Sequence, residues 1–175
     1  RIDLIAHQFW WEARYDATDP ALAFATANEL HVPVGRPVIV TLRSDDVIHS
    51  FWVPSLTGKK DLIPGRESTI AFRADRAGVY RGQCAEFCGY QHAHMALFVM
   101  ADEPADYARW VVNQHAPAKA PATEQERRGL ALVETSTCAM CHAIAGTRAQ
   151  GRRAPDLTHV GSRATIAAGT LPNTA

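Results

Sequence analysis

Four cysteines form two close pairs, and the residues around each pair indicate what chemistry it could carry. The first pair is Cys84 and Cys88, followed at short range by His92 and Met95. Thiolate, imidazole and thioether groups together are typical of copper electron-transfer sites, whereas zinc would not need the methionine. A mononuclear copper site of this kind uses one cysteine, so two thiolates on one short loop could instead bridge two metal ions. The loop is compatible with both arrangements.

Each of two copper ions would need its own imidazole, and the loop supplies one at His92. The candidate for the second is His49, which lies 35 residues before Cys84, where a polar segment becomes strand-like. Taken alone, a histidine on an apolar stretch is more often a core or surface residue than a ligand. The nearby His94 is expected to be a strand residue that faces away from the metal.

The second cysteine pair, Cys138 and Cys141, is followed directly by His142 and matches the C-x-x-C-H signature of covalent c-type haem attachment. The two thiols can reach the two vinyl groups of the haem, and the adjoining imidazole can bind the iron. Electron-transfer haems commonly take a methionine as the sixth ligand, but no methionine follows Met140. We therefore expect the distal ligand to lie beyond Ala175.

Other interpretations of the cysteines remain open at this point. Four cysteines could form two disulfides, and one of the three possible pairings joins Cys84 to Cys88. A C-x-x-C-H sequence could also be a zinc half-site or a redox pair. The copper and haem interpretations account for the neighbouring histidines and for Met95, which the disulfide interpretation leaves as coincidences.

Composition and charge limit the classes of protein to which the chain can belong. Its 175 residues are 47% hydrophobic and 21% charged, with 18 basic and 18 acidic residues, which indicates a globular protein. Nucleic-acid binding is not expected, because proteins with that function carry an excess of Lys and Arg. The sequence contains no apolar run of about 18 residues, so we expect the chain to be soluble as given, with any membrane anchor outside it.

The distribution of charge predicts two units. Residues 1–115 contain 11 basic and 14 acidic residues, a net charge of −3, whereas residues 116–175 contain 7 and 4, a net charge of +3. The change falls in a Pro/Ala-rich stretch that cannot hold a hydrogen-bonded element. We predict a first domain over 1–115, a linker over 116–123 and a partial second domain over 124–175.

The first unit is predicted to be a small β-sandwich, because its apolar or alternating runs are short and are separated by Gly and Pro turns. A short helix after Glu103 should close this domain, since proline and acidic residues favour a first helical turn. In the second unit, Thr123 and Glu126 predict a capping box for a helix over 124–134. The predicted strand runs are 2–11, 37–43, 68–72, 79–83 and 96–100.

The loop CAEFCGYQHAHM at 84–95 resembles the dinuclear copper A motif of cytochrome c oxidase subunit II. The segment VIHSFWVP at 47–54 resembles the part of that family that supplies its first histidine. The segments HQFWWE at 7–12 and LIPGR at 62–66 resemble its aromatic segment and its Pro-Gly-Arg turn. The resemblance implies a mainly β fold, a cupredoxin-like Greek-key β-sandwich, followed by a small partial α-helical cytochrome c unit, as in caa3-type oxidases.

This resemblance also implies a set of copper ligands. Cys84 and Cys88 would bridge two copper ions. His49 and His92 would cap the ions, and Met95 would be a weak ligand. No residue is expected to be catalytic, because a chain of this kind carries electrons and makes no bonds.

Two further implications concern residues beside the copper ligands. Glu86 would give its backbone carbonyl to copper, and its carboxylate would face a magnesium ion shared with subunit I. Electrons would enter at Trp10 and Trp11. The family usually begins its aromatic segment with Trp, whereas this chain has Phe9 there, which leaves the identity of the electron-accepting side chain open.

The function implied by the resemblance is electron transfer within a haem-copper terminal oxidase. Electrons would come from cytochrome c or from the fused haem c, pass through dinuclear copper A and leave toward subunit I, where oxygen is reduced to water. The whole complex would be a proton-translocating oxidoreductase at the periplasmic face of the inner membrane, held by a transmembrane hairpin absent from this chain. The alternatives are the copper A domain of a nitrous oxide reductase-like enzyme and a periplasmic copper-binding or copper-delivery protein.

Overall fold

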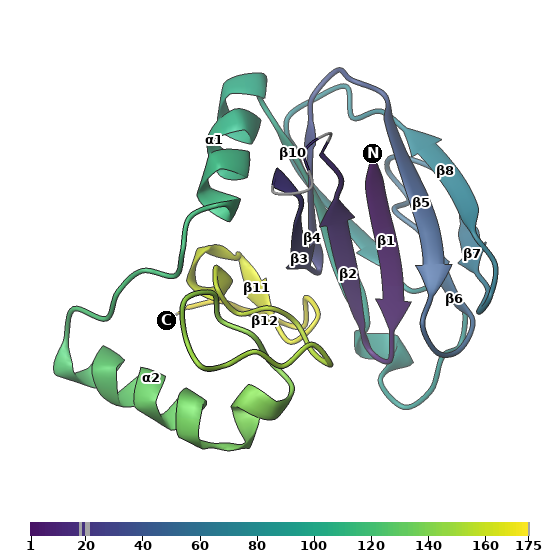
Figure 1. The fold of residues 1–175 in the computed structure, drawn as a ribbon. Coiled ribbons are helices and arrows are strands. Elements are labelled where there is room, and N and C mark those ends of the chain that lie inside the picture. The colour runs from purple at the N-terminus through teal and green to yellow at the C-terminus, as the bar shows by residue number, and fades with distance from the viewer. Residues whose placement is uncertain (18, 20–21, 175) are drawn as a thin grey trace.

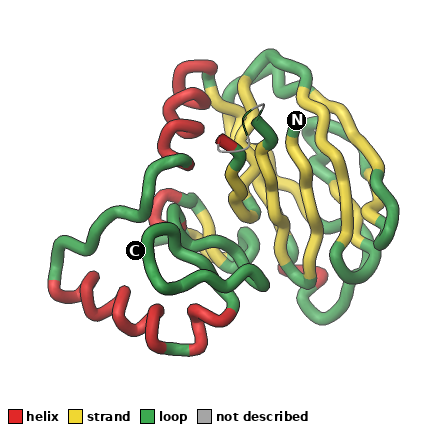
Figure 2. The backbone as a smooth tube through the Cα atoms, viewed as in Figure 1, coloured by secondary structure: helices red, strands yellow, loops and turns green. Residues whose placement is uncertain are grey.

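The computed structural model describes residues 1–17, 19 and 22–174. Figure 1 shows a twisted β-sandwich built by the N-terminal part of the chain and a smaller unit beside it, and Figure 2 shows that loops make up most of the smaller unit apart from one long helix. The larger sheet has the strand order β3-β2-β1-β5-β8, and the second sheet has the order β4-β10-β9. These strands are β1 (Ile2–His7), β2 (Trp10–Tyr15), β3 (Phe24–Ala27), β4 (Glu29–Pro33), β5 (Val38–Ser44), β8 (Ser68–Phe72), β9 (Gly78–Gln83) and β10 (Ala96–Asp102).

The two larger sheets pack through the apolar sides of alternating strands. In β5, Val40 and Leu42 are fully buried, whereas Ile39 and Arg43 are exposed; Thr41 is the exception to this alternation and is buried. Such alternation places one face of a strand in the core and the other in solvent. Both sheets are mixed, because β1 is parallel to β5 and antiparallel to β2, and β10 is parallel to β4 and antiparallel to β9. The prediction of a β-sandwich is confirmed.

Four of the five predicted strand runs agree with observed strands. The strands β5, β8, β9 and β10 cover the predicted runs and differ from them by at most two residues at either end. A further pair, β6 (His49–Phe51) and β7 (Lys60–Leu62), forms a separate two-stranded sheet. β3, β4 and β7 were not predicted from the sequence, and β6 was predicted only as a strand-like segment around His49, because strands of three to five residues seldom give a clear period-two signal.

The prediction of one continuous strand over residues 2–11 was wrong. These residues are divided between β1 and β2, which form a hairpin with Gln8 and Phe9 at its tip. Contacts from distant segments hold this tip. The backbone N–H of Gln8 donates to Asp46 Oδ2 at 2.6 Å, and its side-chain Nε2 donates to the carbonyl oxygen of Cys88 at 2.6 Å.

Both predicted helices are present. Helix α1 (Pro104–Gln114) has proline in its first turn, and its Trp110 stacks on His31 of β4 with a ring separation of 4.1 Å. Helix α2 (Glu124–Thr135) begins with the predicted capping box: the backbone N–H of Glu126 donates to the Thr123 hydroxyl, and the Glu126 carboxylate accepts from the Thr123 N–H. Among the described residues, these helices are neither long nor apolar enough to cross a membrane.

The smaller unit continues from α2 through short 3₁₀ turns to a two-stranded ribbon of β11 (Thr165–Ile166) and β12 (Leu171–Pro172). Residues 116–122 contain neither helix nor strand, in keeping with the linker predicted for 116–123. The domain boundaries themselves stay a prediction. The ribbon lies against the β-sandwich in Figure 1, and the backbone N–H of Ala96 donates to the carbonyl oxygen of Ala168 at 3.1 Å.

Two substitutions in β5 test this packing. Leu42→Ala should lower the free energy of unfolding by about 2–5 kcal/mol, because it removes a fully buried side chain and leaves a cavity. Ile39→Ala in the same strand should change it by less than about 0.5 kcal/mol, because that side chain is 58% exposed. Chemical denaturation of both variants measures the difference. Equal losses would show that β5 does not present Leu42 to the core.

Candidate metal centre

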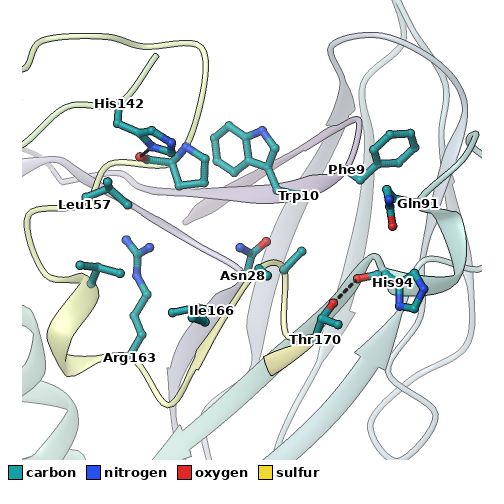
Figure 3. A pocket seen from close by; sticks show the side chains of 14 residues that line it. Phe9, Trp10, Asn28, Gln91, His94, His142, Leu157, Arg163, Ile166 and Thr170 are labelled. Carbon is teal, nitrogen blue, oxygen red and sulfur yellow. Dashed lines mark hydrogen bonds between the residues drawn. The ribbon is translucent and has the colours of Figure 1, made fainter. Parts of the chain in front are cut away.

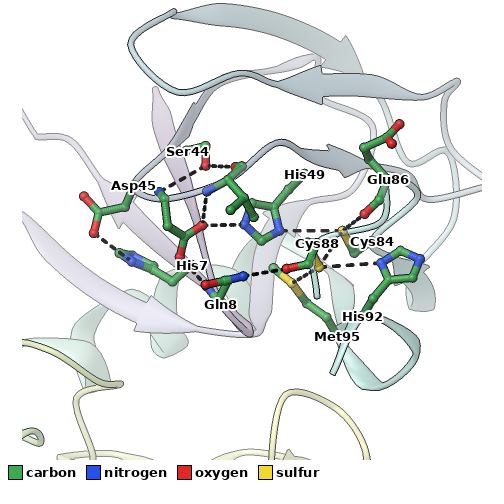
Figure 4. Close-up of polar contacts among 12 residues, drawn as sticks. His7, Gln8, Ser44, Asp45, His49, Cys84, Glu86, Cys88, His92 and Met95 are labelled. Carbon is green, nitrogen blue, oxygen red and sulfur yellow. Dashed lines mark hydrogen bonds and ion pairs between the residues drawn. The ribbon is translucent and has the colours of Figure 1, made fainter. Parts of the chain in front are cut away.

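Five side chains predicted from the sequence gather around two buried sulfur atoms (Figure 4). The Sγ atoms of Cys84 and Cys88 are 3.9 Å apart. His49 Nδ1 lies 3.7 Å from the first sulfur, and His92 Nδ1 lies 3.5 Å from the second. The sulfur of Met95 is 3.8 Å from that of Cys88. A disulfide requires a separation of about 2.05 Å, and both thiols are free, so this arrangement does not support the disulfide interpretation.

The ligand-bearing segments are far apart in the sequence and are joined by backbone hydrogen bonds. The N–H of Cys84 donates to the carbonyl of Met95, and the N–H of Ala85 donates to the carbonyl of Ser50, each at 2.9 Å. Gly82 permits this close approach, since a Cβ atom there would lie 2.8 Å from the carbonyl oxygen of Trp52. The end of β9, the start of β6 and the start of β10 are therefore fixed beside one another.

A second layer of polar groups orients the ligand candidates. The carboxylate of Asp46 contacts His49 Nε2 at 2.7 Å, which leaves Nδ1 directed at the Cys84 sulfur. A partner on the far nitrogen of this kind fixes the tautomer and ring orientation of a metal-binding histidine. Gln8 links the same carboxylate to the carbonyl of Cys88. The sequence analysis did not identify either Asp46 or Gln8, because their roles arise from contacts between distant segments.

The two thiols differ in their tendency to ionise. Burial raises the pKa of Cys84, but the hydrogen bond and charge of the adjacent His49 outweigh this effect and lower the pKa to about 7. Burial raises the pKa of Cys88, and the nearby Cys84 thiolate raises it further, to about 12. The pair therefore releases one proton easily and the second with difficulty. A metal ion would remove this difference because thiolates are its ligands.

Glu86 presents its two kinds of oxygen in different directions. Its backbone carbonyl oxygen is 3.3 Å from the Cys84 sulfur. Its carboxylate points away from the sulfur atoms in Figure 4, and the residue is exposed. The carbonyl is therefore the Glu86 group that is close enough to complete a metal site here, and the carboxylate is free to contact something outside the domain.

Burial gives this cluster the character of a closed metal site. His49 and Met95 are fully buried, and both sulfur atoms belong to buried residues. Ligand atoms of His49, Cys84 and Cys88 all lie within 4.8 Å of one another, which is close enough for a common ion. Soft sulfur with imidazole favours copper or zinc over magnesium or calcium. The additional thioether of Met95 favours copper.

The two tryptophans predicted to receive electrons have different surroundings. Trp11 is fully buried and lies edge-on to the His49 ring, with 6.2 Å between ring centroids. Trp10 is only partly buried and lines a cavity of about 620 Å³ between the two units, together with Phe9 (Figure 3). His142 lines the same cavity. Two neighbouring residues of the β1–β2 hairpin thus face different parts of the molecule. Trp11 faces the candidate metal centre, and Trp10 faces the second unit.

The second unit holds His142 in an orientation suited to a haem. Its Nδ1 contacts the carbonyl oxygen of Pro155 at 2.7 Å, which leaves Nε2 available for iron. Arg163 lines the same cavity, and burial lowers the pKa of its guanidinium. The Nε atom of Arg163 has no hydrogen-bond partner among the described residues. A partly buried cation whose Nε has no partner among the described residues fits an anionic group of a cofactor, such as a haem carboxylate. This role of Arg163 was not predicted from the sequence.

Two other histidines lie outside this cluster, and His94 differs from its expected position. His94 belongs to a 3₁₀ turn (His92–His94) and not to a strand, because the turn bends the chain before β10 begins. It is exposed toward the cavity that Trp10 and His142 line. His159 lines a separate cavity of about 190 Å³ beside Trp110.

The contrast between the two buried thiols can be tested in the metal-free, reduced protein. In a background with Cys138→Ser and Cys141→Ser, the ultraviolet absorbance of thiolate should rise with a midpoint near pH 7 as Cys84 ionises. Cys88→Ser should keep this step, because His49 still stabilises the Cys84 thiolate. Cys84→Ser should abolish it. Identical titration curves for the two single variants would contradict the assignment.

Comparison with known proteins places this site in a family. The sequence matches the family model described as cytochrome c oxidase subunit II, periplasmic domain, over residues 16–102. Cytochrome c oxidase subunit 2 of Alkalihalophilus pseudofirmus is 38% identical over 166 residues, which cover 95% of this chain and 47% of that protein. The Bacillus subtilis protein of the same name is 31% identical over 175 residues, covering 95% and 48%. The chain therefore spans about half the length of these relatives.

A solved structure agrees with the sequence relatives. The crystal structure of the periplasmic domain of subunit II of cytochrome oxidase from Bradyrhizobium japonicum has a TM-score of 0.61 and 30% sequence identity, covering 65% of this chain and 91% of that one. This likeness confirms the expected cupredoxin-like, mainly β fold. The relatives do not favour a nitrous oxide reductase or a copper-delivery protein. The chain belongs to the cytochrome c oxidase subunit II family and contains its periplasmic, cupredoxin-like domain.

Proposed function

We propose that the chain is the electron-transferring part of a haem-copper terminal oxidase. It would accept electrons from cytochrome c or from its own haem c, carry them through a dinuclear copper A centre and deliver them to subunit I for reduction of oxygen to water. The observation that carries this proposal is the convergence of two thiols, two imidazoles and a thioether on one buried point. Family membership supports the same conclusion.

In this proposal, Cys84 and Cys88 would hold the copper ions, and the other ligands would complete the site. Cys84 and Cys88 have the required proximity, with sulfur atoms 3.9 Å apart. His49 and His92 each approach a different sulfur, as expected of two separate caps. The remaining ligands are the Met95 thioether and the Glu86 carbonyl oxygen. The copper pair would supply a one-electron carrier whose charge is shared by two ions.

The protein holds the ligands in fixed positions and excludes water from them. His49 is held on its far side by Asp46, and the backbone of Cys88 is held by Gln8. Both cysteines are buried and are therefore shielded from water. Ligands that cannot move and water that cannot enter reduce the rearrangement that accompanies each change of charge. Rapid electron transfer depends on such small rearrangement.

We propose that electrons enter through Trp10 and Trp11. Trp10 lines the cavity that also contains His142, and Trp11 touches the ring of His49. The fused unit therefore covers the surface through which an electron would arrive. Phe9, at the position where the family usually has Trp, lines the same cavity. In this proposal the haem is the immediate donor, and a separate cytochrome c would deliver electrons to the haem.

The haem would be held by the second unit. Cys138 and Cys141 would attach it covalently, and His142 Nε2 would bind the iron, since Nδ1 is occupied by the Pro155 carbonyl. The attached haem would supply a second one-electron carrier. Arg163 would contact a haem carboxylate, because its guanidinium lines the same cavity with Nε unpaired among the described residues.

The proposed partner of the copper domain is subunit I of the oxidase. The exposed Glu86 carboxylate would face a magnesium ion shared with that subunit. The expected location is the periplasmic, extracytoplasmic side of the membrane, with attachment through a transmembrane hairpin. Neutral overall charge gives no reason to expect a nucleic-acid partner.

Copper binding tests the central claim. The refolded chain should bind two copper ions and show thiolate-to-copper absorption, measured by metal analysis and visible spectroscopy. Cys84→Ser or Cys88→Ser should remove the absorption, because each variant lacks one of the two thiolates that would hold the ions. Glu86→Gln is the matched control in the same loop and should keep the spectrum, because its backbone carbonyl is unchanged. One copper ion per chain with a single blue band would contradict the dinuclear site.

Haem attachment tests the second half of the proposal. Production in an oxidising compartment with a haem-attachment apparatus should give covalently bound haem, detected on the denatured chain, and Cys138→Ala with Cys141→Ala should abolish it. Because residues 141–175 contain no methionine, the iron of this chain should bind added imidazole or cyanide readily. A low-spin His/Met spectrum from this chain would contradict the expectation that it supplies no distal methionine to the haem.

A further inference from the structure

We infer that Glu29 and residues 164–170 form an intramolecular docking interface that holds the second unit on the copper domain. In this interface Glu29 is a positioning residue for electron transfer between the two units. The inference rests on the proposed function for its consequence, but the interface itself is a property of the chain without any cofactor. Its location is the start of β4, against the ribbon of β11 and β12 (Figure 1).

Glu29 is a buried carboxylate whose contacts lie in the other unit. The residue is only 4% exposed. Its Oε1 accepts hydrogen bonds from the backbone N–H of Ala164 at 2.8 Å and of Thr165 at 3.0 Å. Burying a carboxylate is costly unless hydrogen bonds or charges compensate it. Glu29 obtains this compensation from residues about 135 positions later in the chain. The buried carboxylate is therefore stabilised when the interface forms.

A nearby positive charge adds to the compensation. Arg163 directly precedes the two N–H donors, and its interaction with Glu29 favours the charged guanidinium. Opposite net charges of the two predicted units, −3 for residues 1–115 and +3 for residues 116–175, also favour their association. The charge distribution that indicates two units in the sequence is thus complementary across the interface.

The same interface contacts the loop that carries the copper ligand candidates. The N–H of Ala96, directly after Met95, donates to the carbonyl of Ala168 at 3.1 Å. The hydroxyl of Thr170 donates to the carbonyl of His94 at 3.1 Å, as Figure 3 shows. The second unit is therefore attached by hydrogen bonds to the backbone on both sides of a proposed copper ligand.

Gly169 permits this close contact. A Cβ atom at this position would lie 2.9 Å from the ring of Phe98 and 3.1 Å from the side chain of Ala96. Its φ of +77° lies in the region that favours glycine. The ribbon turn is thus shaped to sit directly on β10, and a larger residue would push the second unit away.

The interface decides how the two proposed centres face each other. The segment 116–122 contains neither helix nor strand, so the covalent link alone would permit many arrangements. Docking at Glu29 and at the copper loop selects the one in which Trp10 and His142 line a common cavity. A fixed arrangement lets each electron cross without a diffusive search by the tethered unit.

The test uses the chain matured with copper and haem. Glu29→Ala should speed amide hydrogen exchange at Ala164, Thr165 and Ala96 by about tenfold or more, because their N–H groups become open to water. It should also slow electron transfer from haem to copper after flash reduction by about tenfold, with both visible spectra unchanged. Glu29→Gln retains an acceptor oxygen and should restore part of both effects. Glu103→Ala, which removes an exposed carboxylate, is the matched control and should change neither.

A second variant covers the case in which Glu29→Ala fails to fold. Thr170→Val removes the exposed hydroxyl donor to the His94 carbonyl and should raise exchange at Ala96 while leaving the copper spectrum intact. Unchanged exchange in both variants would overturn the interface. Faster exchange with an unchanged transfer rate would overturn the positioning role. Absence of copper and haem spectra in the parent chain would count against the proposed function, and the exchange measurements would still decide the interface.

Discussion

The burial of two thiols beside two imidazoles is the constraint on which the rest of the structure depends. Two sulfur atoms 3.9 Å apart cannot both ionise easily away from water, so burial and the Cys84 thiolate raise the pKa of Cys88 to about 12. The pKa of Cys84 is instead lowered to about 7, because the hydrogen bond and charge of His49 outweigh the effect of burial. The surrounding groups compensate this unfavourable arrangement. His49 faces Cys84, and Asp46 holds His49 from behind. A pair of buried thiols that resists full ionisation would favour a bound metal cation. Metal binding would stabilise both thiolates and thereby the folded state.

The hairpin of β1 and β2 connects this centre to the remainder of the molecule. At its tip, Gln8 bonds both to the Asp46 carboxylate and to the backbone of Cys88, so it couples two loops that would otherwise be independent. Just beyond the tip, Trp11 enters the core against His49, whereas Trp10 faces the second unit. The alternation of side chains along a strand therefore gives one short element two tasks. It supports the ligands on one side and forms part of the proposed electron path on the other.

The second unit has few buried apolar side chains of its own. Among the described residues after 123, only Ala149 belongs to the buried hydrophobic set, and a unit this small gains little stability from its core alone. Its order depends on the capping box of α2, on hydrogen bonds around His142 and on its contacts with the β-sandwich. The same contacts bring the candidate haem attachment site beside Trp10. In the proposed function, the stability of this unit and electron transfer would depend on the same interface, which favours a lasting association over a transient encounter.

The sequence by itself determined those features that depend on local spacing. The C-x-x-x-C and C-x-x-C-H motifs, the capping box at Thr123 and Glu126, and the runs that become β5, β8, β9 and β10 all rely on residues a few positions apart. Tertiary structure alone decided the division of residues 2–11 into a hairpin, the roles of Asp46 and Gln8, and the contacts of Glu29 and Arg163. The partners of these polar groups lie up to about 135 residues away, and no local pattern specifies which distant donor a buried charge will meet. Short strands such as β7 were not predicted for the related reason that their pairing, and not their periodicity, makes them strands.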